Sequence, residues 1–128
     1  MFLLDTCTLL WLAADQRKLS ETAKRQIDNH PDSLFVSAIS AFEIALKYRQ
    51  RKLGLPQPPM DWFTEIMEFH GIRELPVTSS IAILSTQLPP MHNDPADRMI
   101  IATAVLNTLT IITCDELIAQ YQQVKVIW

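Results

Sequence analysis

The feature that most constrains the fold is a set of short, continuous apolar runs separated by segments with helical patterning. The runs at residues 2–4 and 34–36, and the two isoleucines within the strand expected at 110–113, lack the polar alternation of a strand with one solvated face. Strands that are apolar on both faces and alternate with helices are typical of a parallel sheet covered on each side. The pattern therefore predicts an α/β fold, a three-layer α/β/α sandwich around a central, mainly parallel sheet.

Capping and helix-breaking residues divide the rest of the chain into further elements. Asp94 followed by Pro95 is a typical helix start, because aspartate caps the helix and proline fits its first position. Ser37 or Ser40 is expected to cap a helix that runs to about residue 51, and Gly71 is a typical helix end. These signals predict further helices at 9–14, 20–29, 61–69, 78–88, 94–107 and 115–120, and further strands at 72–77 and 124–128.

The length of 128 residues predicts a single domain that spans residues 1–128. The two cysteines form no Cys-x-x-Cys pair, which favours a reducing cytoplasm over a disulfide framework. The apolar start contains Asp5 and no basic segment, and no apolar run reaches about 18 residues. We therefore expect a cytoplasmic protein without a membrane segment. The net charge of −3 offers no general attraction for nucleic acids.

Two acidic residues directly follow predicted strands. Asp5 comes after the strand at 2–4, and Asp115 comes after the strand at 110–113. The carboxyl ends of parallel strands share one edge of the sheet, where ligands gather, so both side chains are expected there. Each also has an ordinary explanation: Asp5 could cap the next helix, and Asp115 could occupy a first helical turn capped by Thr113.

Two more acids interrupt apolar helix faces. Asp97 shares a face with Ile100 and Ile101 and so points toward the sheet, a direction that a favourable place in the helix dipole does not explain. Glu43 lies on what we expect to be the buried face of its helix, beside Phe42. A carboxylate in an apolar stripe is rarely tolerated unless it is paired or bound to a cation. An ion pair with Lys47, one turn on, is the alternative for Glu43.

The four acids together form a candidate metal site. Two carboxylates ~6 Å apart repel by about 3 kcal/mol at an effective dielectric near 20, so a cluster raises its pKa values or recruits a cation. The ligands are hard oxygens, with no His or Cys set at metal-binding spacing, which favours Mg²⁺ or Mn²⁺ over Zn²⁺. Such a site suits phosphodiester cleavage. The candidate catalytic and metal-binding residues are Asp5, Glu43, Asp97 and Asp115.

Five short motifs occur in order along the whole chain. They are Asp5-Thr6, Ser40-x-x-Glu43-Ile44, the run His92-Asn93-Asp94-Pro95-Ala96-Asp97-Arg98 before an Ile-Ile-Ala-Thr-Ala helix, Thr113-x-Asp115, and Val126-Ile127-Trp128. Each motif is weak alone, whereas the ordered set is specific. It resembles the PIN-domain family and, more narrowly, the VapC-type toxins of bacterial type II toxin–antitoxin pairs.

The resemblance implies a PIN-like α/β/α sandwich that cleaves RNA with one or two Mg²⁺ or Mn²⁺ ions, and a cognate antitoxin protein as partner. It implies supporting roles beside the metal for Thr6 and Thr113. Asp94 also matches the family pattern, and we interpret it as a helix cap close to the site rather than a ligand. Many relatives carry an aromatic residue where this chain has Ala96, a departure that concerns packing. Carried over by position, the metal-binding acids are Asp5, Glu43, Asp97 and Asp115.

Positive charge is expected beside the acids, because RNA phosphates must approach them. We expect Arg98 and Lys47 to contact the RNA, although basic residues at a helix end also have an explanation in the helix dipole. His92, a single histidine in a loop, is more often incidental than catalytic. The aromatic residues around Trp11 and Trp62 suggest a homodimer contact or an antitoxin groove, with plain core packing as the alternative.

Other protein classes also place acids at strand ends. A response-regulator receiver needs a paired acid near the first strand and a lysine after a late strand, and neither is present. A haloacid-dehalogenase-type phosphatase needs Asp-x-Asp after the first strand, but position 7 is Cys7. An interaction module whose acids only cap helices, and which cleaves nothing, is the remaining alternative.

Overall fold

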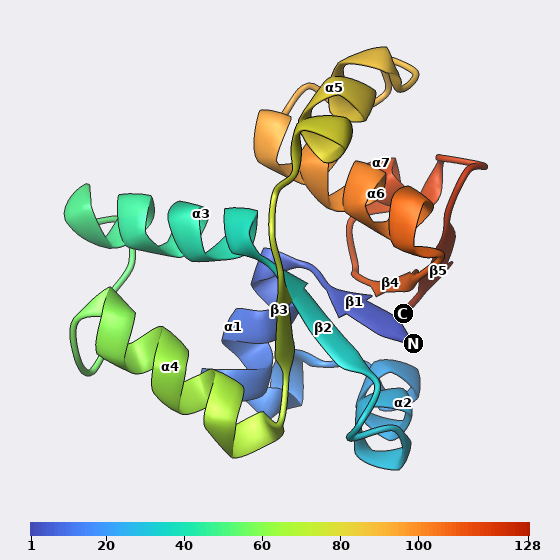
Figure 1. Ribbon diagram of the computed structural model, residues 1–128. Helices are drawn as coiled ribbons and strands as arrows, with labels where there is room; N and C mark the ends of the chain where they lie inside the picture. The colour runs from blue at the N-terminus through green and yellow to red at the C-terminus, as the bar shows by residue number, and fades with distance from the viewer.

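A computed structural model describes residues 1–128 and contains a single five-stranded sheet (Figure 1). The strand order is β3-β2-β1-β4-β5, and every neighbouring pair is parallel. Helices cover both faces of the sheet, so the predicted α/β/α sandwich is confirmed. The strands are β1 (Phe2–Leu4), β2 (Leu34–Ser37), β3 (Arg73–Leu75), β4 (Thr110–Ile112) and β5 (Lys125–Ile127).

Seven α-helices connect the strands, close to the predicted positions. A short 3₁₀ turn, η1, follows the first helix and was not expected from the sequence. None of the helices combines the length and the apolar character needed to cross a membrane. The helices are α1 (Thr6–Ala14), α2 (Glu21–Asn29), α3 (Ala38–Arg49), α4 (Pro59–His70), α5 (Ser79–Gln87), α6 (Pro95–Asn107) and α7 (Glu116–Ala119), and η1 is Gln16–Lys18.

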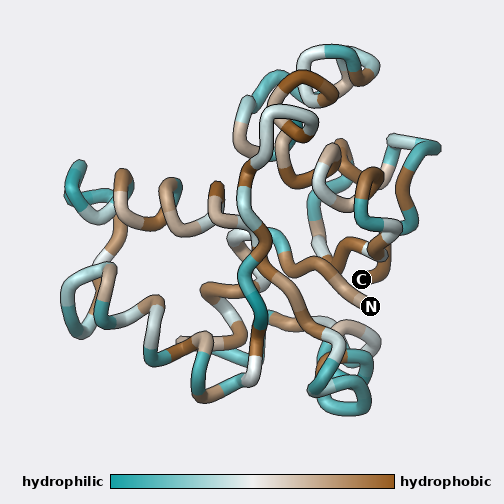
Figure 2. Tube along the Cα trace, in the orientation of Figure 1, coloured by the Kyte–Doolittle hydropathy of each residue, from teal (hydrophilic) through white to brown (hydrophobic).

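The sheet separates two apolar cores. Leu4 packs on one face with Leu9 of α1 and Ile44 of α3, whereas Leu3 packs on the other face with Ile100 of α6. Successive residues of a strand point to opposite faces, which is why a strand buried on both sides has no polar alternation. Figure 2 shows this distribution, with hydrophobic residues along β1 and a largely hydrophilic α2.

The chain reverses its direction of winding between β1 and β4. From β1 it proceeds through β2 to β3 on one side, and it then returns to the other side for β4 and β5. Leu4 is in register with Ile112, and the Asp5 N–H donates to the Ile112 carbonyl at 3.3 Å. Such a switch point opens a crevice at the carboxyl ends of the strands. The segments that follow β1 and β4 therefore line the crevice.

Helix caps fix how those segments leave the sheet. The side chains of Asp5 and Asp115 accept backbone N–H groups at the starts of α1 and α7. Asp94 caps α6 with Pro95 at its first position, as predicted. Of the two serines considered for α3, Ser37 is the cap. Capping at strand ends brings polar side chains to one edge of the sheet.

Two sequence expectations need correction. Phe42 was expected on the buried face of α3, but it is 59% exposed, and Ser40 and Ile44 are buried instead. In Figure 1, α3 extends away from the sheet, so only part of its surface meets other elements. The strand expected at 72–77 shrinks to β3, at the sheet edge, where Arg73 and Glu74 are exposed.

Candidate functional site

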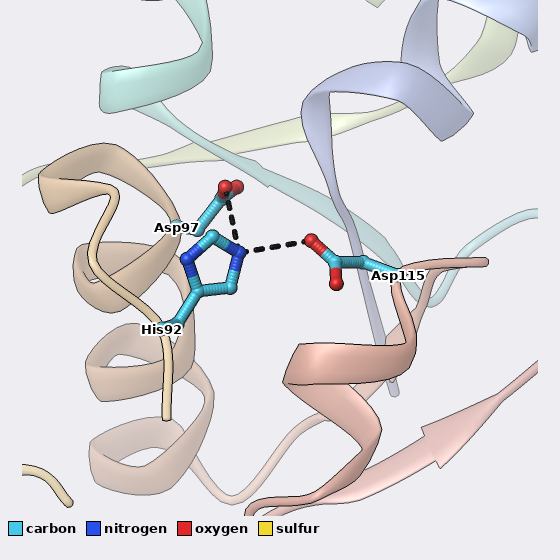
Figure 3. Close-up of side chains that lie close together, drawn as sticks. All are labelled: His92, Asp97 and Asp115. Atoms are coloured by element: carbon cyan, nitrogen blue, oxygen red, sulfur yellow. Dashed lines mark hydrogen bonds and ion pairs between the residues drawn. The ribbon is translucent and has the colours of Figure 1, made fainter. Parts of the chain in front are cut away.

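Two of the four acids converge on one histidine at the crevice. Asp97 extends from the first turn of α6, and Asp115 lies at the start of α7, after β4. His92 lies between them: its Nε2 is 3.1 Å from Asp97 Oδ2 and 2.9 Å from Asp115 Oδ2 (Figure 3). These three atoms all lie within 4.8 Å of one another, which is the spacing of groups that could hold a metal ion.

Asp5 joins this group through Thr113. The Thr113 hydroxyl donates to Asp5 Oδ2 at 2.5 Å, and its own Oγ1 accepts the backbone N–H of Asp115 at 3.0 Å. The other Asp5 oxygen, Oδ1, accepts the N–H of Thr8 at 2.8 Å. Thr113 thus fixes two acids relative to each other, from the position expected of a supporting residue.

Glu43 approaches the site from α3 and is held by Thr6. The Thr6 hydroxyl donates to Glu43 Oε1 at 2.5 Å and lies 2.9 Å from the Ser40 hydroxyl. A hydroxyl has one proton, so Thr6 donates to the carboxylate and accepts from Ser40. Lys47 forms no ion pair with Glu43, and the alternative of a simple i,i+4 pair is therefore not realised.

The acids perturb one another electrostatically. Burial, followed by the charges of Asp94 and Glu43, raises the pKa of Asp97 from 3.8 to about 7. Burial also raises the pKa values of Asp5 and Glu43. Burial alone would raise the pKa of Asp115 as well, but hydrogen bonds from His92 and from backbone N–H groups of α7 outweigh it and lower that pKa. Burial and the neighbouring negative charges therefore disfavour the ionised form of Asp97.

The donor set fits a hard divalent cation. None of Asp5, Glu43, Asp97 and Asp115 pairs with a lysine or arginine, since the only Lys or Arg ion pair joins Arg17 to Asp15. Buried carboxylates without a cationic partner are expensive unless a bound cation neutralises them. Oxygen ligands in this number are those preferred by Mg²⁺ and Mn²⁺.

Arg98 does not have the role that the sequence suggested. Its Nε donates to the Ser85 carbonyl at 2.9 Å, and its Nη2 donates to the Leu88 carbonyl at 2.7 Å. Its Nη1 donates to the carbonyls of Pro89 at 2.9 Å and His92 at 3.0 Å. Because all three guanidinium nitrogens donate hydrogen bonds to backbone carbonyls, Arg98 fixes the loop before α6 and is not available to bind a phosphate. Lys47 is exposed and stays a predicted RNA contact.

His92 is the residue that sequence reasoning undervalued. It is only 8% exposed and contacts two of the acids, although it belongs to an irregular loop without periodicity. One feature of the sequence could have indicated its role: His92 lies two residues before the helix cap Asp94, within reach of the backbone N–H of Asp94. A loop histidine at that spacing is oriented by the helix start rather than by its own segment.

We predict that metal affinity depends on pH through Asp97. Its folded pKa of about 7 means that a cation must displace a proton below that pH. The Mn²⁺ affinity should therefore fall by up to about tenfold per pH unit below 7 and level off above about 8, with Asp5 and Glu43 steepening the fall. Calorimetry in buffers of different ionisation enthalpy measures both the affinity and the proton release. A constant affinity from about pH 5.5 to 8.5 contradicts the prediction.

Comparison with known proteins agrees with this geometry. The sequence matches the family model of the PIN domain over residues 2–123. Ribonuclease VapC22 of Mycobacterium tuberculosis is 36% identical over 114 residues, which cover 88% of this chain and 85% of that protein.

Solved structures share the fold. VapBC2 from Rickettsia felis, bound to a DNA fragment from its promoter, matches with a TM-score of 0.74 at 10% identity, over 98% of this chain and 96% of that one. A toxin–antitoxin complex from Klebsiella pneumoniae matches with a TM-score of 0.70 at 21% identity, over 100% and 97% of the two chains. At these identities the structures establish the fold, while the family match and the identity to the ribonuclease establish descent. The chain belongs to the PIN-domain family, as a relative of the VapC ribonucleases.

Proposed function

We propose that this protein is a metal-dependent endoribonuclease that hydrolyses RNA phosphodiesters and acts as the toxin of a type II toxin–antitoxin pair. The proposal is supported chiefly by the cluster of acids at the switch point, which has no Lys or Arg partner. The relative that shares 36% identity over most of both chains is itself a ribonuclease. Residues 1–128 are proposed to form the single catalytic domain.

Mg²⁺ or Mn²⁺ is the proposed cofactor, because divalent ions are usual for PIN-domain nucleases and the donors are oxygens. Such a cation stabilises the charge that develops on the phosphoryl oxygens and lowers the pKa of the attacking water. Asp97 and Asp115 are proposed as its principal ligands, with Asp5 and Glu43 completing the negative site around it. Zn²⁺ is disfavoured, since a single histidine and no cysteine accompany the two aspartates.

The surrounding hydroxyl groups keep the carboxylates in place. Thr113 fixes Asp5 against Asp115, and Thr6 fixes Glu43 against α1. Preorganisation of this kind matters because a cation or phosphate that meets fixed charges needs no costly rearrangement. A cavity of about 400 Å³ opens beside Asp115 and reaches Trp128, which gives an RNA strand room to approach.

Helix capping alone does not explain the acids. It accounts for Asp5 and Asp115, which accept backbone N–H groups at the starts of α1 and α7. It does not account for Asp97 and Glu43, which cap nothing and yet lie partly buried among other acids. A protein that used its acids only as caps would have no reason to keep these two, so the interaction-module alternative is disfavoured.

A cognate antitoxin is the proposed protein partner, by analogy with the complex from Klebsiella pneumoniae, which is a toxin–antitoxin assembly. A homodimer is also proposed. Of the aromatic residues considered for these contacts, Trp62 lies in the core, whereas Trp11 and Phe63 are only partly buried against it. The partly buried residues are those that leave surface for a partner.

The proposal is tested with the purified protein and a structured RNA. We expect cleavage that requires Mg²⁺ or Mn²⁺, stops on chelation and resumes when the ion is restored. Mn²⁺ should also raise the melting temperature in the absence of RNA, because it binds only the folded state. A protein that neither binds Mn²⁺ nor cleaves any RNA in its presence has a different function.

A further inference from the structure

The imidazole of His92 is oriented by hydrogen bonds at both nitrogens. Its Nδ1 accepts the backbone N–H of Asp94 at 3.2 Å. A backbone N–H can only donate, so Nδ1 carries no proton and the proton of the neutral ring lies on Nε2. Nε2 is the atom that meets Asp97 and Asp115 (Figure 3). One N–H group therefore serves two carboxylates.

The backbone of His92 is held as firmly as its ring. Its N–H donates to the hydroxyl oxygen of Tyr121 at 2.9 Å, and its carbonyl accepts from Arg98 at 3.0 Å. Tyr121 is itself buried, and its hydroxyl donates to the Pro89 carbonyl at 2.7 Å. Arg98 and Tyr121 thus form a cradle around the backbone of His92. The cradle fixes the direction in which the imidazole points.

These contacts distinguish a hydrogen-bond donor from a metal ligand. A ligating histidine offers an unprotonated nitrogen to the metal and normally donates its other N–H to an acceptor. In this protein the partner of Nδ1 is a donor, so ligation through Nε2 would place two N–H groups against each other at Nδ1. The carboxylate oxygens have further lone pairs, and each can accept from His92 while it faces a cation.

We propose that His92 is a positioning residue of the metal site: its Nε2–H sets the spacing of the Asp97 and Asp115 carboxylates and does not itself bind the metal. The inference rests on the proposed metal-dependent function, because it assigns His92 a task at that site. His92 acts on the cation through the two acids, and the cradle formed by Arg98 and Tyr121 acts through His92. The irregular loop before α6 is thereby part of the site.

The first test reads the tautomer in the unmodified, ¹⁵N-labelled protein by long-range ¹H–¹⁵N NMR at about pH 8. His92 should carry its proton on Nε2, both without metal and with saturating Mg²⁺. His30 is the internal reference, because its Nδ1 lies 2.9 Å from the Gln26 carbonyl and must donate to it. A proton on Nδ1 of His92, or its transfer there when Mg²⁺ is added, overturns the proposal.

The second test compares two substitutions by Mn²⁺ calorimetry without RNA. His92→Leu removes the polar contacts of both ring nitrogens at similar volume, and we expect Mn²⁺ affinity to fall by about 10- to 100-fold, as for other residues that orient ligands. His92→Gln can donate toward the acids and accept from Asp94, and it should restore affinity to within about threefold. Equal affinity in all three proteins, or no recovery with glutamine, overturns the proposal.

These measurements separate the two proposals. A wild-type protein that binds Mn²⁺ and shows the expected tautomer, yet cleaves no RNA, refutes the proposed function and leaves the role of His92 intact. Thermal unfolding of each variant shows whether it folds, and the tautomer measurement needs no substitution. Each result therefore supports or overturns one stated role.

Discussion

Replacing Asp97 by asparagine is expected to abolish RNA cleavage while making the metal-free protein more stable. Asparagine keeps the volume of the side chain, and the helix cap, Asp94, is untouched. The loss of one charged ligand should lower activity by at least about 100-fold, because the loss of a residue that merely orients a ligand already costs 10- to 100-fold. Cleavage at the wild-type rate by this variant removes Asp97 from the mechanism.

The gain in stability follows from the raised pKa. Asp97 has a folded pKa of about 7 and an ordinary value of 3.8, so the folded state binds the proton more tightly than the unfolded state. The penalty for its charge is absent below about pH 4, grows as the pH rises, and is complete above about pH 7. The Asp97 side chain is 21% exposed, and solvent screening reduces the penalty for its charge. We therefore expect Asp97→Asn to raise the free energy of unfolding by about 1–2 kcal/mol at pH 8.

Thermal unfolding at two pH values checks this expectation. Asp97→Asn should melt about 4 °C higher than the wild type at pH 8 without metal, and the difference should vanish near pH 4. Mn²⁺ should raise the melting temperature of the wild type and have little effect on the variant. Asp28→Asn, an exposed substitution on α2, is the control and should change neither activity nor melting. A variant that is less stable than the wild type at pH 8 contradicts the electrostatic argument.

Arg98→Met is expected to lower the free energy of unfolding strongly, although Arg98 is only partly buried. It removes the donor to the carbonyls of Ser85, Leu88 and His92, and it leaves the Pro89 carbonyl with the Tyr121 hydroxyl alone. Hydrogen bonds from charged groups contribute about 1.5–3 kcal/mol each and are not additive, so we expect a loss of about 3 kcal/mol in the free energy of unfolding. That corresponds to a drop in melting temperature of about 10 °C.

The comparison with Arg17→Met isolates the role of the cradle. Arg17 is exposed and pairs only with Asp15 at the surface, so its loss should leave the melting temperature nearly unchanged. Arg98→Lys should be nearly as unstable as Arg98→Met, because an ammonium group cannot reproduce the fork that reaches several carbonyls. Unchanged melting of Arg98→Met, with weaker RNA binding and a smaller salt dependence, would restore the role of a phosphate contact.

Local signals were sufficient to predict most of the fold. The Asp94-Pro95 start of α6 and the Gly71 end of α4 depend on a few neighbouring residues, and the structure has both. The exposed face of α3 was not predictable in this way. Its apolar residues are spread around the helix, and which of them is buried depends on how far α3 extends beyond the sheet, as Phe42 shows.

The site was predictable in outline but not in its contacts. The topology of a parallel sheet sufficed to place the acids after β1 and β4 at one edge, because that argument needs only strand ends. It could not show that Thr113 would link Asp5 to Asp115, or that Arg98 would turn inward. Those contacts depend on the path of the loop before α6, which has no periodicity to read. The net charge was also a poor guide, since an acidic site lowers it.

The pairing of β1 with β4 has a consequence for the order of events during synthesis. Leu4 meets Ile112 across more than a hundred intervening residues, and two acids of the proposed centre, Asp5 and Asp115, follow those two strands. Contacts so distant in sequence form late, after the loop between them has closed. A nascent chain of which only β1, β2 and β3 have left the ribosome therefore lacks a complete active site. With the site as proposed, we expect the nascent protein to cleave no RNA until Asp115 has emerged and β4 has docked.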